Sequence, residues 1–269
     1  MIHTSGLLLC LLCVIGVNST VNASNNNTSN HPTGASSHFP VIVQKIESHS
    51  PLIFTQGFIK QDHVFYISSG LYKQSFIQRN DKQHTLSYSL PPRYFAEGLT
   101  LFNDRLYLLT WKEETLFILN QHTLQPEKTL RYQGEGWGLT HNSTHLIMSN
   151  GSSTLLFRDP NDFSIWRRLT VNQALQLNEL EYVNGIIWAN DWNEDTIYGI
   201  SEHSGCVIAT LDLSYLRQQT VTPNRSNISN GIAYDKQAHG LWVTGKYWPS
   251  RYLIQYPEID TQKIHNTAC

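Results

Sequence analysis

The sequence predicts an all-β fold, a five-bladed β-propeller that is closed by an N-terminal strand. Three observations predict it. A short motif recurs five times, each copy is followed by a regular series of apolar runs, and one further run, residues 41–47, stands alone before the first copy. Val, Ile, Leu, Tyr, Phe and Thr dominate these runs, which is typical of strands. No long stretch has a 3.6-residue period, so few helices are expected.

The repeated motif is clearest in its first three copies. These read Phe-Thr-Gln-Gly-Phe from Phe54, Phe-Ala-Glu-Gly-Leu-Thr from Phe95 and Gly-Trp-Gly-Leu-Thr from Gly136, and weaker copies begin at Leu177 and Ser229. Successive copies are 41, 40, 41 and 52 residues apart, measured at Gly57, Gly98, Gly138, Glu179 and Gly231. The longest interval contains the polar insert 218–230, which we expect to be a loop. A period near 40 residues with four strands per unit is typical of propeller blades.

Each copy of the motif is itself the innermost strand of a predicted blade, and further strands follow it. The second strands are residues 64–68, 106–110, 146–149, 186–190 and 241–244, and the next are 75–79, 115–119, 154–158, 196–200 and 252–256. Outer strands follow in four copies, at residues 86–90, 127–132, 165–171 and 207–213. The fifth copy has none, so we expect residues 41–47 to supply it and to close the ring, which removes an exposed sheet edge. A β-sandwich is the alternative, but it does not explain five copies in phase.

The N-terminal segment predicts secretion. Residues 7–17 form an apolar run of 11, too short to span a bilayer as a helix. Val21-Asn22-Ala23 follows as a small-residue cleavage site. We therefore expect a signal peptide over residues 1–23, with an uncleaved anchor as the alternative. A disordered Asn/Ser-rich leader is predicted over 24–40, the propeller domain over 41–257 and a C-terminal tail over 258–269. The protein is expected outside the cell, in the secretory lumen or in the periplasm, without membrane contact after cleavage.

Composition and charge limit the partners and covalent features. The chain is 40% hydrophobic and 15% charged, with a formal net charge of −2 and no Lys/Arg-rich run, which argues against nucleic acid. Cys206 and Cys269 remain after signal cleavage; an oxidising compartment permits a disulfide between them, and two free thiols are the alternative. In a host that glycosylates, the protein is expected to be a glycoprotein, because N-x-S/T sequons occur at Asn26, Asn27, Asn142, Asn150, Asn224 and Asn227.

The inner motif predicts a pocket at one end of the central channel. Equivalent positions in a propeller converge there, and they are occupied by Gln56, Glu97, Trp137, Asn178 and Asn230 or a neighbour. Trp111, Trp192 and Lys246 each follow the second strand of a blade and are expected nearby. Aromatic walls around one carboxylate, two or three amides and one ammonium suit a small polar head.

Each residue of the predicted pocket could have either a chemical or a purely structural role. A carboxylate in a Trp-lined cavity is expected to have a raised pKa, which prepares Glu97 for proton transfer near neutrality. Lys246 and Asn178 could then donate to an oxyanion. The tryptophans could equally serve blade packing, Glu97 could cap a turn, and Lys246 could be a solvated surface lysine. The histidines and cysteines form no zinc or triad pattern.

These motifs, in this order and spacing, resemble the plant and bacterial type of glutaminyl-peptide cyclotransferase, best known from papaya latex. The resemblance runs from about residue 41 to 256 and rests on residues 54–57, 69–72, 95–100, 136–139, 177–182, 188–192, 230–233 and 243–249. It implies a five-bladed propeller and an enzyme that converts the N-terminal glutamine of peptides and proteins to pyroglutamate with release of ammonia. Glu97 would be the proton shuttle. The implied lining residues are Phe54, Gln56, Phe95, Trp111, Trp137, Asn178, Trp192 and Lys246.

The expected reaction is an intramolecular acyl transfer, so no enzyme nucleophile, cofactor or metal is required, although a structural cation is compatible with the sequence. Two other functions are alternatives. A metal-dependent, lactonase-like hydrolase could use Glu97, Asn178 and Glu179 around a cation, although a hard cation usually takes more anionic ligands. A non-catalytic binding propeller is the other. Because a closed propeller buries its own sheet edges, a monomer is expected.

Overall fold

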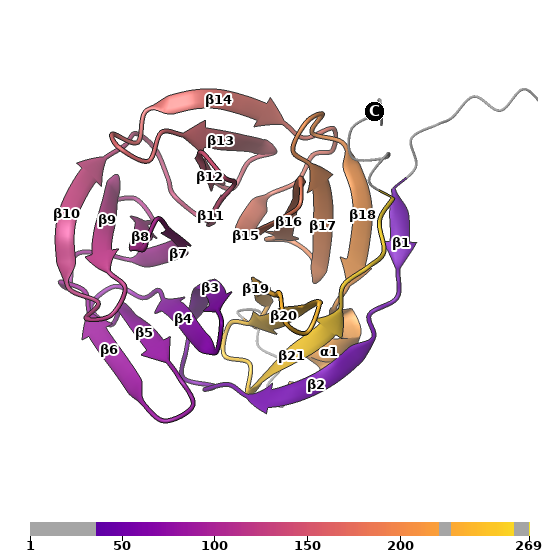
Figure 1. The fold of residues 1–269 in the computed structure, drawn as a ribbon, viewed down its shortest axis with the longest axis horizontal. Helices are drawn as coiled ribbons and strands as arrows, with labels where there is room; N and C mark the ends of the chain where they lie inside the picture. Colours follow the sequence, from indigo (N-terminus) through magenta and orange to yellow (C-terminus); the bar gives the residue numbers. More distant parts are fainter. Residues whose placement is uncertain (1–35, 221–226, 261–268) are drawn as a thin grey trace, which may run out of the picture. The chain divides into compact units, whose positions relative to one another are not determined.

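The structure is a computed structural model that describes residues 36–220, 227–260 and Cys269. Its described residues form five sheets arranged as blades around a central axis (Figure 1). The predicted five-bladed propeller is therefore confirmed. From the axis outward, blade one contains β3 (Thr55–Gln61), β4 (Val64–Ser69), β5 (Phe76–Asn80) and β6 (Thr85–Ser89). Blade two contains β7 (Ala96–Phe102), β8 (Arg105–Thr110), β9 (Thr115–Asn120) and β10 (Pro126–Arg131).

The remaining blades follow the same order. Blade three contains β11 (Leu139–His141), β12 (Leu146–Met148), β13 (Thr154–Arg158) and β14 (Ile165–Thr170). Blade four contains β15 (Leu177–Val183), β16 (Ile186–Asp191), β17 (Thr196–Ser201) and β18 (Val207–Asp212). Blade five contains β19 (Ser229–Asp235), β20 (Gly240–Gly245) and β21 (Ser250–Gln255). The inner strands contact one another around the ring, with β19 against β3 at the closure.

An N-terminal strand completes blade five, as predicted. β2 (Val43–Ser48) pairs antiparallel with β21, with Ile46 opposite Tyr252. Arg251 on β21 donates from Nε and Nη2 to Glu47 Oε2, at 3.0 and 2.6 Å, across this pairing. Since the first and last parts of the propeller share one sheet, strand pairing locks the ring, and blade five has no unpaired outer edge at β21.

The boundary predicted for the disordered leader is wrong for its last residues. β1 (Ser37–Phe39) pairs in parallel with β18 and adds a fifth strand to blade four. His38 Nδ1 is also hydrogen-bonded to Thr210 Oγ1, at 2.6 Å. A three-residue strand held mainly by backbone bonds leaves no periodic pattern in the sequence. The predicted signal peptide and the first part of the leader lie outside the described residues, as does most of the predicted tail.

One short helix was not anticipated: α1 (Ser214–Gln218) follows β18 and precedes the predicted loop. Its apolar Leu216 is buried, and its Arg217 contacts Asp195 at 2.7 Å. Five residues are too few to show a helical period, so the sequence could not indicate this element. Across the described ranges, the structure contains no helix with the length and apolar character needed to cross a membrane.

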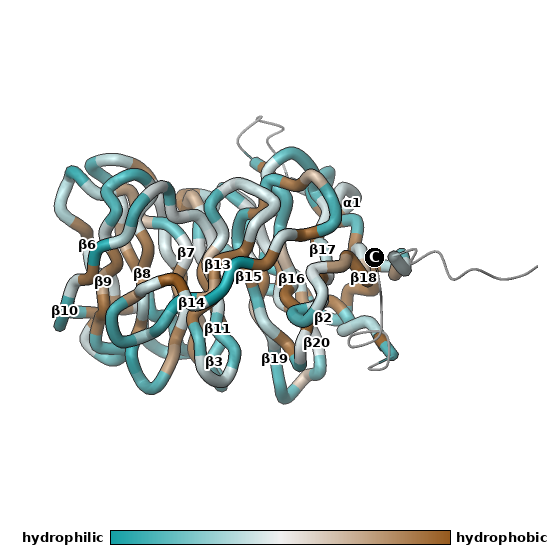
Figure 2. Tube along the Cα trace, turned by 90° about the horizontal axis from the view of Figure 1, so that it is seen from above, coloured by the Kyte–Doolittle hydropathy of each residue, from teal (hydrophilic) through white to brown (hydrophobic). Residues whose placement is uncertain are grey.

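The hydrophobic core is divided into layers between neighbouring blades. One cluster joins Phe58 of blade one to Trp242 of blade five, and another joins Trp188 of blade four to Val243 of blade five. Figure 2 shows the hydrophobic residues along the strands and the hydrophilic ones mainly in the connecting loops. Each blade thus buries both faces against its neighbours, which fixes the positions of the inner strands around the axis.

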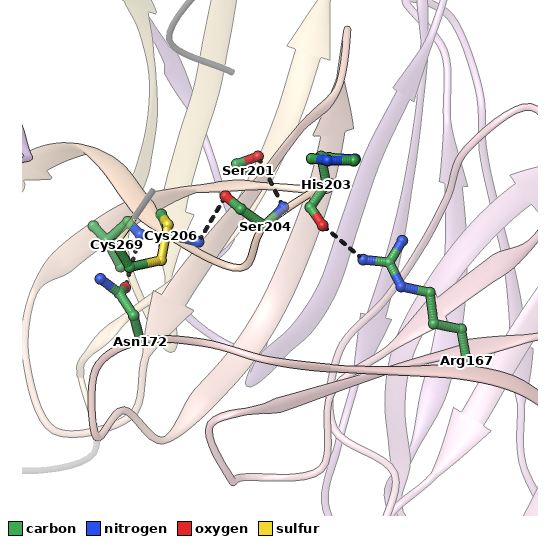
Figure 3. The surroundings of a disulfide bond; sticks show 8 residues. Arg167, Asn172, Ser201, His203, Ser204, Cys206 and Cys269 are labelled. Atoms are coloured by element: carbon green, nitrogen blue, oxygen red, sulfur yellow. Dashed lines mark hydrogen bonds between the residues drawn. A yellow bond between two sulfur atoms is a disulfide. The ribbon is translucent and has the colours of Figure 1, made fainter. Parts of the chain in front are cut away.

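A disulfide joins Cys206 to Cys269, with a Cα–Cα distance of 5.4 Å (Figure 3). The sequence left this pairing open. Cys206 lies in the turn between β17 and β18, where its N–H donates to Ser204 Oγ, and the neighbouring Val207 N–H donates to Asn172 Oδ1. Cys269 follows the last strand of blade five in the chain. The bond therefore ties the end of the chain to blade four, the same blade that receives β1.

Truncation from the N-terminus should separate these roles. Removal of residues 1–35 is expected to leave the cooperative thermal unfolding of the domain intact. Removal of 1–40 takes away only β1 and should lower the melting temperature by a few degrees, as a loss of ~1 kcal/mol would. Removal of 1–48 also deletes β2 and opens blade five, so no cooperative transition should remain. Calorimetry of the three proteins checks this, and a normal transition after removal of 1–48 would contradict the closure.

Candidate active site

Four of the five inner strands have an irregularity at the repeated motif. The register of pairing shifts between Thr55 and Gly57, between Ala96 and Leu99, and at the matching positions of β15 and β19. A bulge interrupts the alternation of side chains and re-aims one of them. The residues within these irregular stretches include Gln56, Glu97, Asn178 and Asn230, which the motif predicted to converge. The bulges thus place one polar side chain from each of these four blades at the axis.

Glycine at the motif allows neighbouring inner strands to approach closely. A β-carbon at Gly138 would overlap the carbonyl oxygen of Asn178 on the next blade. Gly98 N–H donates to the carbonyl of Trp137 at 2.6 Å, again across a blade boundary. Any larger residue at Gly138 would push blades three and four apart at the level of the pocket. The glycines of the motif therefore bring the polar side chains within reach of one another.

The nine residues predicted for the site line a single cavity of about 230 Å³. The structure brings all of them together: Phe54, Gln56, Phe95, Glu97, Trp111, Trp137, Asn178, Trp192 and Lys246. They come from all five blades, because each blade supplies its motif residue or the residue after its second strand. The catalytic or binding role of each of these residues stays a prediction.

Glu97 is the carboxylate of this cavity, and its side chain is held by a relay across three blades. Gln56 Nε2 donates to Glu97 Oε1 at 3.0 Å, and Asn230 Nδ2 donates to Gln56 Oε1 at 3.2 Å. Asn230 therefore fixes which end of the Gln56 amide faces Glu97. Burial raises the pKa of Glu97 well above its ordinary value, Lys246 opposes this rise, and the charges of Glu113 and Glu135 add to it.

Lys246 is fully buried, so the alternative of a solvated surface lysine is wrong. Its Nζ lies 4.2 Å from the ring centre of Trp192 and 4.7 Å from that of Phe54. It has no hydrogen-bond partner among the described residues, and the same is true of Asn178 Oδ1. Burial lowers the pKa of Lys246 to about 8, against the opposing effect of Glu97. The cavity thus presents an ammonium and an amide oxygen that are free to meet a ligand.

Aromatic side chains form the walls and extend to the rim. Phe54 packs edge-on against Phe95, and Trp137 against Trp192, with ring centres 6.3 and 5.6 Å apart. The exposed Tyr72 packs behind Phe95, with ring centres 5.3 Å apart, and was not predicted as a site residue although the motif at 69–72 contains it. Its hydroxyl donates to Glu113 at 2.7 Å.

Carboxylates behind the walls were also missed. Glu113 accepts from the backbone N–H of Phe95 at 3.2 Å, and Glu135 accepts from the indole N–H groups of Trp111 and Trp137. Glu135 is adjacent in the sequence to a motif copy that begins at Gly136, and this adjacency was the only signal that could have indicated it.

Glu179 was considered as a cation ligand in the lactonase-like alternative. In the structure its carboxylate instead binds backbone groups of neighbouring blades. It is fully buried, and its two oxygens accept from the backbone N–H groups of Phe58 and Ile232 at 3.2 and 2.8 Å. It therefore joins blade four to blades one and five. Within the described ranges, no group of three or more His, Cys, Asp or Glu side chains is placed to hold a metal ion.

A second, larger cavity of about 480 Å³ lies at the other ends of the inner strands. Residues that end β3, β7 and β11 line it, among them Gln61, Phe102 and His141. One of its acids, the partly buried Glu181, accepts from the backbone N–H of Tyr234 at 3.2 Å. The smaller cavity is the better candidate site because it combines the converging motif residues with polar atoms that have no hydrogen-bond partner among the residues the structure describes.

Comparison with known proteins agrees with this assignment. The sequence model of the glutamine cyclotransferase family matches residues 11–256. A glutaminyl-peptide cyclotransferase of Arabidopsis thaliana is 34% identical over 218 residues, which is 77% of this chain and 68% of that protein. The crystal structure of glutaminyl cyclase from Myxococcus xanthus superposes with a TM-score of 0.76 and 30% identity, over 84% of this chain and all of that one. The chain therefore belongs to the glutamine cyclotransferase family.

Proposed function

We propose that this protein converts the N-terminal glutamine of peptides and proteins to pyroglutamate in the cavity around Glu97. The observation that carries the proposal is the pairing, in one small Trp-lined cavity, of a buried carboxylate with a buried ammonium that has no hydrogen-bond partner in the described part of the chain. An N-terminal glutamine brings the complementary groups, an amine that must lose a proton and an amide oxygen that must gain negative charge.

The reaction is an acyl transfer within the substrate. The α-amine nitrogen attacks the side-chain amide carbon, the new C–N bond closes a five-membered ring, and the bond from that carbon to the amide nitrogen breaks. We assign Glu97 to accept the proton of the amine and to deliver it to the leaving nitrogen, so that ammonia departs. Lys246 donates from Nζ, and Asn178 from its amide nitrogen Nδ2, to the oxygen while it carries negative charge.

The walls of the cavity supply orientation. The nucleophile is already tethered, so folding the glutamine side chain back onto its amine can supply much of the acceleration. Phe54, Phe95, Trp111, Trp137 and Trp192 enclose the substrate in this proposal, and Gln56 holds Glu97. Every step uses the chain's own groups, and we therefore propose that the reaction needs no metal or cofactor.

We also propose that the protein is a secreted glycoprotein and acts as a monomer. The disulfide supports an oxidising compartment. Among the sequons, Asn142 and Asn150 are partly exposed, whereas Asn227 is only 2% exposed and is a poor acceptor in the folded chain. Asn26, Asn27 and Asn224 lie outside the described residues. The ring that β2 closes supports the monomer, since it leaves blade five without a free edge at β21.

An assay with the purified protein tests the proposed activity. A peptide that begins with glutamine should lose one ammonia and gain a blocked N-terminus, with the same rate after treatment with a chelator. The same peptide with an acetylated N-terminus is the control, because its nitrogen cannot attack. If a chelator abolished turnover, the metal-dependent alternative would be favoured. If the protein showed no turnover at all, a non-catalytic binding propeller would be favoured instead.

A further inference from the structure

Glu135 links two walls of the cavity without lining it. It lies between Gly134 and Gly136, in the segment that joins β10 to β11. Its Oε2 accepts from Trp111 Nε1 at 2.8 Å and from Trp137 Nε1 at 3.0 Å. Trp111 follows β8 of blade two, and Trp137 precedes β11 of blade three. A single carboxylate oxygen therefore holds two indoles from two different blades.

In both hydrogen bonds the indole is the donor and the carboxylate is the acceptor. An indole N–H can only donate, and an ionised carboxylate can only accept. Bonds of this charge-assisted kind are stronger than those between neutral groups. Partial burial raises the pKa of Glu135, but the two indole N–H groups and the charge of Lys112 outweigh it, and the pKa lies below its ordinary value. The group is thus a carboxylate at neutral pH.

The backbone on both sides of Glu135 is fixed. Gly136 N–H donates to the carbonyl of Trp111 at 2.9 Å, and Gly134 N–H donates to Glu114 Oε1 at 3.0 Å. Lys112 lies with its Nζ 3.7 Å from Glu135 Oε1 and 3.9 Å from the ring centre of Trp111. The segment that carries Glu135 is therefore held by the turn between β8 and β9, which also carries its indole partner Trp111.

The restraint extends further into the cavity through ring contacts. Trp137 packs edge-on against Trp192, whose ring in turn lies 4.2 Å from Lys246 Nζ. A change in the orientation of Trp137 would move the ring that faces the buried ammonium. Glu135 can thus influence three tryptophan walls while about 40% of its own side chain remains exposed to solvent. Because of that exposure, its replacement should not unfold the protein.

We propose that Glu135 is a positioning residue: by accepting from both indoles it fixes the tryptophan walls that fold the substrate's glutamine side chain onto its own amine. This inference rests on the proposed function and deepens it. It assigns Glu135 no contact with substrate and no proton transfer.

Two variants separate positioning from charge. Glu135→Gln keeps a carbonyl oxygen that can accept from both indoles but removes the negative charge, whereas Glu135→Ala removes both. We expect kcat/KM on a Gln-initiated peptide to stay within about 3-fold of wild type for Glu135→Gln. It should fall roughly 10- to 100-fold for Glu135→Ala, since a misplacement of ~1 Å can cost ~10²-fold. Glu127→Ala, an exposed acid on β10, is the matched control and should change little.

A double-mutant cycle identifies the path of the effect. Trp111→Phe removes one indole N–H, so Glu135→Ala should cost less in this background than in wild type if the two act through each other. A loss for Glu135→Gln as large as that for Glu135→Ala would overturn the proposal, because charge alone would then explain the effect. The proposal would also be overturned if kcat/KM of Glu135→Ala stayed within 3-fold of wild type.

Fluorescence gives a readout that does not need turnover. Loosened indoles admit water and quencher, so acrylamide should quench tryptophan emission more strongly in Glu135→Ala than in wild type or Glu135→Gln. Equal quenching in all three proteins would show that Glu135 does not hold the walls. A wild-type protein that fails to cyclise the peptide would instead refute the proposed function, while the quenching comparison would still decide the role of Glu135.

Discussion

Replacement of Glu97 by glutamine should abolish most of the activity and leave the fold intact. Glutamine is nearly isosteric with glutamate, and its carbonyl oxygen can still accept from Gln56 Nε2, so the packing of the cavity should change little. It cannot take a proton from the substrate's amine. Positioned acid–base catalysis is typically worth ~10²–10⁴-fold, and we expect kcat to fall by that factor.

The control for this variant is Glu181→Gln. Glu181 is also a glutamate with a raised pKa, which desolvation brings to about 8, but it is only partly buried and lies at the opposite end of the channel. The same chemical change there should leave kcat near the wild-type value. If Glu97→Gln keeps more than about a tenth of wild-type kcat with an unchanged melting temperature, Glu97 is not the proton shuttle. Water or the substrate itself would then have to carry the proton.

Lys246→Met should produce the second largest loss. Methionine fills a similar volume and keeps favourable contacts with the rings of Trp192 and Phe54, so the domain should stay folded. It removes a donor to the developing oxyanion, which typically costs roughly 10²–10³-fold in kcat. We expect kcat to fall less for Lys246→Met than for Glu97→Gln, because Asn178 can still donate to the oxyanion.

The pH dependence of this loss follows from the two shifted groups. Lys246 has a pKa of about 8, so its positive charge is present below that pH and is lost above it. The charge also opposes the raised pKa of Glu97, and its removal should raise that pKa further. Both effects raise kcat/KM of the wild type above that of Lys246→Met most strongly at low pH. The ratio of kcat/KM between wild type and Lys246→Met should therefore decrease as the pH rises through about 8.

Taking this ratio cancels the titration of the substrate's own amine, which both proteins share. Melting temperatures at each pH serve as the control for folding. A ratio that does not change between pH 6 and pH 9 would contradict a role for the charge of Lys246, whatever the size of the loss at a single pH.

Much of the fold was predictable because it is a repeat. Each blade buries its faces against similar neighbours, so the same apolar series recurs five times, and the unpaired residues 41–47 indicated the closure. The features that were missed depend on backbone pairing or on very few residues. β1 adds to blade four by main-chain bonds, and α1 is a five-residue helix; neither leaves a pattern of side chains.

The nine lining residues could be located because equivalent positions of a propeller converge at one end of its channel. The residues behind them could not. Glu135 meets Trp111 from a position 24 residues away in the chain, and no motif or period relates the two. The burial of Lys246 likewise depends on how Phe54 and Trp192 pack around it. No distance between Cys206 and Cys269 follows from the sequence, so only the folded chain could decide between a disulfide and free thiols.

A crystal structure of the Glu97→Gln variant with a Gln-initiated peptide would show directly whether the cavity around residue 97 binds the reacting glutamine. The variant should bind the peptide without converting it. The account predicts that the N-terminal glutamine occupies the cavity of nine residues, with its amine beside residue 97 and its amide oxygen facing Lys246 and Asn178. A peptide bound at the opposite end of the channel, or one whose amine points away from residue 97, would contradict it.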